Sequence, residues 1–167
     1  MSGNSNIKLA YQSILEHDFE QAIEWFQQAV LEEPDNAEFH YKLSITYARS
    51  NKLSPALMHA REAMRLDPTY RTHYNHLRAR ELVKKAGRRM EQGIGDLQSA
   101  AEMLKRAIQL DGLFLEAYLL LGVAYTGLRR YASAAETLKE ALRLDPMRED
   151  ARHLLQQLEQ NELYSNR

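Results

Sequence analysis

Two of the six histidines lie three residues apart, and they are the side chains with the clearest capacity for chemistry. His73 and His76 would share one face of a helix, and a third residue such as His40 could complete a set of metal ligands. Histidines in such places more often serve as polar members of a groove or as satisfied core groups. Cysteine is absent, which excludes thiolate ligands, thiolate nucleophiles and disulfides. We therefore predict no metal and no cofactor.

The motifs of the common enzyme classes are also missing. The sequence contains no phosphate-binding loop, no dinucleotide fingerprint, no Gly-x-Ser-x-Gly and no His-Glu-x-x-His. Its many glutamates lie where solvated helix faces are expected. The prediction is that the chain is not an enzyme.

Helices are the elements that must position any functional side chain in this sequence. Only four Pro and seven Gly occur among 167 residues, and the apolar residues recur at helical rather than alternating spacing. The length falls in the range of a single domain. We therefore predict an all-α fold, with one domain over residues 1–167.

A period of 34 residues organises the chain. It is marked by three sets of residues, namely Pro34, Pro68, Gly112 and Pro146; Ala22, Ala56, Ala100 and Ala134; and Leu9, Leu43, Leu77 and Leu121. One step in each set is 44 residues, and comparison of the sets places the ten extra residues between Leu77 and Ala100. The expected repeats are about 3–34, 35–68, 69–112 and 113–146, followed by a helix over 147–164 that covers the open end.

Within a repeat, the pattern predicts two helices and a tight turn. The last repeat shows it most fully, in the residues Tyr118, Leu121, Gly122 and Tyr125 of a first helix and Ala134, Leu138, Ala141 and Pro146 of a second. This pattern resembles the tetratricopeptide repeat (TPR) family. The resemblance implies a right-handed superhelical stack of about four antiparallel helix hairpins, a TPR solenoid with a C-terminal capping helix, which acts as a protein–protein interaction scaffold or adaptor.

Helix boundaries are predicted from capping chemistry and from the two glycines near residue 94. Asp35 with Glu38, and Ser54 before Pro55, are expected at helix starts. The simplest account of the third repeat is a second helix from about Arg88 to Leu110, with Gly87 ending the first helix. A break at 93–95 is the alternative.

The resemblance implies that first helices line a concave groove, which would hold a partner peptide or helix. Carried over residue by residue, the groove candidates are Ile7, Tyr11, Tyr41, Ile45, Arg49, Asn75, His76, Ala79, Val83, Leu119, Val123 and Thr126. Most of them are apolar, which favours an apolar or amphipathic segment. The alternatives are that some face the terminal helix, or that the groove or the capping helix forms a homo-oligomer interface. The Lys, Asn and Arg set of the family's carboxylate-binding members is not present.

Positive charge gathers in the middle of a chain whose formal charge is −1. Residues 71–90 carry seven basic groups and one acidic group, including a basic patch of Arg78, Arg80, Lys84, Lys85, Arg88 and Arg89. This patch could dock an acidic partner or could be an ordinary solvated face. Nucleic acid is not predicted as a partner, because no row of stacking aromatics accompanies the charges. No membrane partner and a cytoplasmic location are predicted, since no leader or long apolar run is found.

Overall fold

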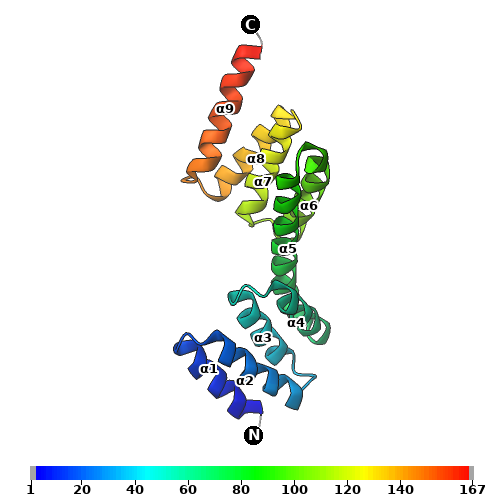
Figure 1. Cartoon of the computed structure of the whole chain (residues 1–167), viewed down its shortest axis with the longest axis vertical. Helices are drawn as coiled ribbons and strands as arrows, with labels where there is room; N and C mark the ends of the chain where they lie inside the picture. The colour runs from blue at the N-terminus through cyan, green and yellow to red at the C-terminus, as the bar shows by residue number, and fades with distance from the viewer. Residues whose placement is uncertain (1–2, 166–167) are drawn as a thin grey trace. The chain divides into compact units, whose positions relative to one another are not determined.

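The computed structural model describes residues 3–165, and every regular element in this range is helical (Figure 1). The chain divides into two compact units, Met1–Leu77 and Arg78–Arg167. The prediction of an all-α chain built from helix hairpins is confirmed.

Unit 1 consists of two helix hairpins and the first residues of a fifth helix. Its elements are α1 (Gly3–Leu15), α2 (Phe19–Glu32), α3 (Ala37–Arg49), α4 (Leu53–Leu66), the short 3-10 helix η1 (Pro68–Tyr70) and the start of α5 (Arg71–Gln92). α1 packs on α2, α2 on α3 and α3 on α4. One core cluster joins these helices, with Phe26, Leu43 and Leu77 among its fully buried side chains.

Unit 2 begins with the rest of α5 and continues, within the described residues, through four further α-helices. Its other elements are the 3-10 helix η2 (Ile94–Asp96), α6 (Leu97–Leu110), α7 (Leu115–Gly127), α8 (Tyr131–Leu144) and α9 (Glu149–Ser165). Ala79, Ala86 and Leu104 belong to one core cluster, which joins α5, α6 and α7. Leu119, Leu138 and Leu158 belong to a second one, which joins α7, α8 and α9.

The turn inside a hairpin has the same backbone in three of the repeats. His17, Asn51 and Arg129 have φ angles of 60°, 58° and 57°, which lie in the left-handed region. In each turn the next residue donates its amide to a carbonyl five residues earlier, as Asp18 does to Ser13 at 2.9 Å, Lys52 to Tyr47 at 2.9 Å and Arg130 to Tyr125 at 2.8 Å. This geometry closes the C-terminus of the first helix by satisfying one of its free carbonyls.

α5 overturns the expected boundaries of the third repeat. The helix runs through Gly87 to Gln92, so the prediction that Gly87 ends it and that a second helix starts near Arg88 is wrong. The apolar stripe of Val83, Ala86 and Met90 continues past the normal repeat end and packs in the unit 2 core, which keeps this stretch helical. The alternative of a break at 93–95 is the one observed, with Gly93 at φ 125°, a conformation that side chains rarely adopt.

Two predicted helix starts are displaced by one or two residues. Asn36 rather than Asp35 caps α3, because its Oδ1 accepts the amide of Phe39 at 3.2 Å. α4 begins at Leu53, immediately after the closed turn, so Ser54 lies inside the helix and is not its cap. Pro55 still falls in the first turn, where the amide that proline lacks would have no intrahelical partner.

Candidate protein-binding surface

Unit 1 carries a set of partly exposed aromatic side chains on α1, α3 and the junction before α5. Tyr11 of α1 is 43% exposed, and its ring lies edge-on to the buried Phe26 at a centroid distance of 5.9 Å. Phe26 therefore fixes the ring while one side of it stays open to solvent.

Lys42 of α3 connects Tyr11 to the rest of this surface. Its Nζ donates a hydrogen bond to the Tyr11 hydroxyl, lies 5.1 Å from the centre of that ring, and pairs with Glu38 at 3.0 Å. Burial of the Lys42 side chain lowers its pKa, but the hydrogen bonds to Tyr11 and Glu38 outweigh this effect, and the net pKa is raised. The ammonium is therefore a fixed positive group beside an exposed ring.

Tyr41 lies next to Lys42 in sequence and contacts two aromatic rings from the following junction. It stacks on Tyr70 at 4.6 Å and meets His73 edge-on at 4.8 Å. Ile45 follows Tyr41 by one helical turn and is half-buried. We name the set of these side chains the unit 1 face, which comprises Tyr11, Tyr41, Lys42, Ile45, Tyr70 and His73.

Seven of the predicted groove residues belong to unit 1. Tyr11, Tyr41 and Ile45 are in the unit 1 face, Ile7 packs at the edge of the core, and Asn75 is half-buried. Arg49 and His76 are exposed. Tyr70 was not predicted as a member, because it lies in a junction rather than on a first helix. His73 was considered as a metal ligand, as a polar groove member or as a core group, but it was not assigned to the groove.

In unit 2 the structure contradicts part of the predicted groove. Ala79, Val83 and Leu119 are buried in core clusters and offer no surface to a partner, so their assignment to the groove is wrong. Leu119 shares its cluster with Ala151 and Leu158 of α9, which agrees with the alternative that some of these residues face the terminal helix.

Two other groove candidates of unit 2 stay at or near the surface. Val123 is 39% exposed, and Thr126 is half-buried, with its hydroxyl donating to the carbonyl of Gly122 at 2.8 Å.

The histidines of unit 1 join helices through hydrogen bonds. His40 Nε2 lies 2.9 Å from the carbonyl oxygen of Pro34, which can only accept, so that nitrogen carries the proton. His40 Nδ1 therefore accepts the bond of 3.0 Å from His59 Nδ1. Burial and the neighbouring imidazole of His40 lower the pKa of His59 to about 4, and Glu62 opposes this only partly.

Ser44 lies one turn after His40 on α3 and makes a second polar link between helices. Its hydroxyl donates to the carbonyl of Ala56 at 2.7 Å and therefore accepts from His73 Nε2 at 2.9 Å. Burial lowers the pKa of His73, with a further contribution from His76. In the described part of the chain, no group of three or more His, Asp or Glu side chains is arranged to hold a metal ion.

Comparison with protein families decides what this chain of hairpins is. Two family models described as tetratricopeptide repeat match residues 16–71 and 93–158, which together make up most of the sequence. The chain belongs to the tetratricopeptide repeat family. Among the described residues, we find no helix that combines the length and the apolar character of a membrane span.

Solved TPR structures share this fold at low sequence identity. MamA from Desulfovibrio magneticus RS-1 is 17% identical, with a TM-score of 0.59 over 96% of this chain and 85% of that chain. YrrB, described as a TPR protein with an unusual peptide-binding site, is 19% identical, with a TM-score of 0.54 over 90% of this chain and 73% of that chain. Heat shock protein STI1 of Saccharomyces cerevisiae is 33% identical over 95 residues, which are 56% of this chain but only 14% of STI1.

Proposed function

We propose that this TPR chain is a non-enzymatic scaffold for protein–protein interaction, and that the unit 1 face binds a short apolar or amphipathic segment of a partner protein. The observation that carries this proposal is the set of aromatic and aliphatic side chains that unit 1 holds side by side and partly exposed. The absence of cysteine suits a reducing compartment, and the cytoplasm is the location that we propose with it.

The rings of the unit 1 face suit the anchoring of a peptide. Tyrosine is enriched among the residues that dominate binding energies, because a rigid ring buries a large area with little loss of side-chain entropy. Tyr11 is fixed by Phe26, and Tyr41 is fixed between Tyr70 and His73. Their conformations are therefore set before a partner arrives, which lowers the entropic cost of binding.

Lys42 supplies a polar contact that would fix the direction of the segment. Its ammonium has three donors, and the bonds to Tyr11 and Glu38 account for two of them. The third donor can bind a main-chain carbonyl of a peptide lying across the rings. The solved structure of YrrB supports the proposal to the extent that this fold can present a peptide-binding site.

The test starts from peptides selected against the purified chain from a random peptide library. Ile45→Asp places a carboxylate in the unit 1 face one helical turn after Tyr41, and we expect it to weaken binding of a selected peptide at least roughly tenfold, as burying an unpaired charge would. Fluorescence anisotropy of the labelled peptide gives the affinity.

Met58→Asp is the matched control, because Met58 is 61% exposed on α4 and lies outside the unit 1 face. This variant should bind the selected peptide with the same affinity as the unmodified chain. Equal affinities for the Ile45→Asp and unmodified chains would contradict the proposal. Light scattering at increasing protein concentration tests the alternative function, self-association. If the unmodified chain forms dimers and Ile45→Asp abolishes them, the unit 1 face is an interface between copies of the chain.

A further inference from the structure

The basic residues of α5 in unit 2 differ in whether an acidic side chain neutralises them. Glu81 forms ion pairs with both Arg78 and Lys85, and Arg89 pairs with Asp96 at 3.3 Å. Among the side chains that the structure describes, the other three cations of the predicted basic patch form no ion pair, and they are Arg80, Lys84 and Arg88. We call these three residues the basic row.

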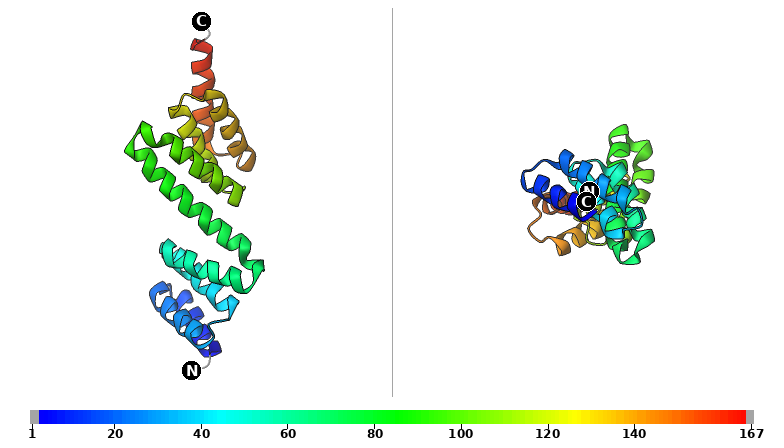
Figure 2. Two further views of the ribbon diagram at one scale, coloured as in Figure 1. Left: turned by 90° about the vertical axis from the view of Figure 1, so that its right-hand side faces the viewer. Right: turned by 90° about the horizontal axis from the view of Figure 1, so that it is seen from below.

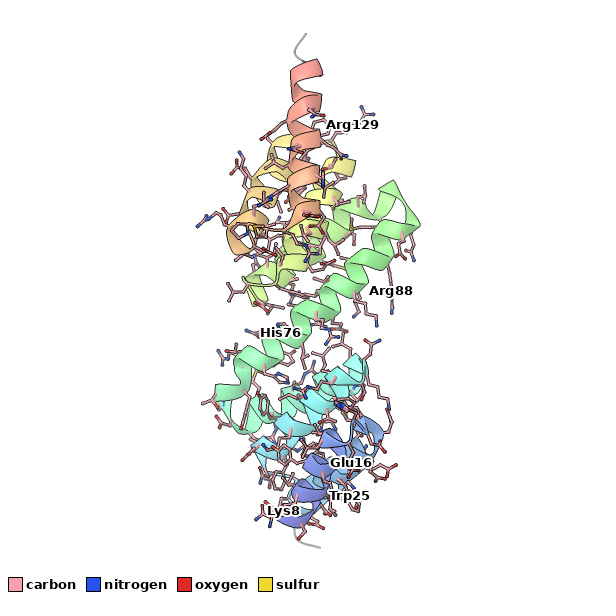
Figure 3. All side chains as sticks on the ribbon, turned by 90° about the vertical axis from the view of Figure 1, so that its left-hand side faces the viewer. Lys8, Glu16, Trp25, His76, Arg88 and Arg129 are labelled. Atoms are coloured by element: carbon pink, nitrogen blue, oxygen red, sulfur yellow. The ribbon has the colours of Figure 1, made fainter. Side chains whose placement is uncertain are left out.

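The basic row runs along one side of the helix. Its members are four residues apart, so they are about 6 Å apart along the axis and on neighbouring turns. The buried residues Ala79, Val83 and Ala86 lie on the side that packs in the unit 2 core. Lys84 and Arg88 are exposed, and Figure 3 shows the Arg88 side chain standing out from the ribbon of α5.

Helix stability alone does not account for this row. Cations in the last turn of a helix interact favourably with its dipole, which explains Arg89 near the end of α5 but not the row. Arg80 and Lys84 are in the middle of α5, where the dipole effect has faded. Like charges one turn apart repel each other and destabilise a helix. The nearest other acid on α5, Glu91, forms no ion pair with the row.

We propose that the basic row binds a carboxylate-rich segment of a partner protein. The spacing fits such a segment, because alternate side chains of an extended peptide lie roughly 6.6 Å apart, close to one turn of α5. Residues 78–92 contain no aromatic side chain on which bases could stack, which argues against single-stranded nucleic acid. This surface is on unit 2 and is independent of the peptide site proposed for unit 1.

The experiment measures binding of a fluorescein-labelled peptide of alternating Glu and Ser to the full chain at low salt. The double variant Lys84→Gln/Arg88→Gln removes two members of the row. We expect it to bind the peptide roughly 3- to 30-fold more weakly, as the loss of two exposed ion pairs implies. Added salt should weaken binding to the unmodified chain.

The matched control is Lys139→Gln/Arg143→Gln, which removes two exposed cations of α8 that pair with Glu136 and Glu140. It should bind the peptide within about twofold of the unmodified chain, whereas an equal loss in both double variants would overturn the proposal. Equal binding of a Gln-Ser peptide would overturn it too.

Two further probes separate the other kinds of occupant. The first probe is labelled single-stranded DNA. If it binds through the row and the Glu-Ser peptide does not, the row is a nucleic-acid site and the proposal is overturned. Light scattering that shows copies of the chain associating through the row would also overturn it. Ile45→Asp should leave the Glu-Ser peptide bound, so failure of the unit 1 proposal is distinguishable from failure of this one.

Discussion

At the scale of single residues, His40 and Ser44 show how polar side chains join the helices of unit 1. They are one turn apart on α3. His40 accepts a hydrogen bond from His59 of α4, and Ser44 donates to the carbonyl of Ala56 of α4 and accepts from His73 of α5. His40 must accept at Nδ1, so a proton on that nitrogen would face the proton of His59. The arrangement is complete only when His40 is neutral.

We expect the stability of unit 1 to fall as the pH falls below the ordinary histidine value of about 6.5. The pKa of His59 is about 4 in the folded chain, so the unfolded chain binds protons first on acidification. The contribution is full above pH 6.5 and is lost progressively toward pH 4. After allowance for solvent screening, the loss is about 1–2 kcal/mol.

Urea unfolding at pH 7.5 and pH 5.5 measures this effect. His59→Gln keeps an amide donor for His40 but cannot titrate, so the difference in unfolding free energy between the two pH values should shrink. His153→Gln removes an exposed histidine of α9 and should leave the difference as it is in the unmodified chain. An unchanged difference for His59→Gln would exclude His59 as the source.

Prediction of the site from sequence succeeds or fails according to what covers each residue. Tyr11 and Tyr41 are surface residues in the structure, although binding at them stays a prediction. The assignment of Val83 and Leu119 to the groove failed, because the repeat pattern gives each residue a position on a first helix but does not identify the neighbour packed against it. Val83 is buried in the cluster that joins α5, α6 and α7, and residues of α9 share the cluster of Leu119.

At the scale of elements, glycines show which helix positions tolerate a side chain. Gly87 is inside α5, and a Cβ there would meet nothing within 4 Å. Gly122 of α7 faces the fully buried Leu138, whose Cδ2 would lie 2.7 Å from an added Cβ. The same substitution should therefore have opposite effects at the two positions.

Gly87→Ala should stabilise the chain by about 0.5–1 kcal/mol, because alanine loses less backbone entropy in a helix interior. Gly122→Ala should destabilise it by about 1–3 kcal/mol, because the fully buried Leu138 side chain would have to shift in the core. Thermal unfolding followed by circular dichroism measures both. If Gly87→Ala lowers the melting temperature, α5 is not continuous through residue 87 in solution.

The same glycines explain which boundaries could be predicted. Glycine breaks or ends helices often enough that Gly87 was a reasonable stop signal, but the apolar stripe through Ala86 and Met90 gains enough burial to continue the helix. Gly93 was also a stop signal, and its positive φ makes it the residue at which the chain turns. The local sequence alone therefore does not show which of the two glycines, Gly87 or Gly93, ends the helix.

At the scale of the whole molecule, each unit has a core of its own. Leu43 is fully buried in the cluster of unit 1, and Leu104 is fully buried in a cluster of unit 2. Figure 2 shows α5 as one continuous green ribbon, and the boundary between the units falls inside this helix. The repeat period predicted the hairpins because packing positions recur, but it did not predict this division.

Leu43→Ala should cost about 2–5 kcal/mol and should accelerate amide hydrogen exchange mainly in unit 1. Leu104→Ala should act mainly in unit 2, which makes the two variants controls for each other. Mass spectrometry of peptic fragments locates the change. Equal acceleration in both units by either variant would mean that the chain unfolds as one cooperative body.

The length of α5 also sets the side of the helix axis at which the chain leaves this helix. α1, α3 and α7 have 13 residues each, whereas α5 has 22. The nine additional residues make two and a half turns, so the chain leaves α5 about 13.5 Å farther along and on the opposite side of the helix axis. Insertions or deletions in this stretch would thus swing the start of α6 around the axis by about 100° per residue, and only changes near whole turns would preserve its packing.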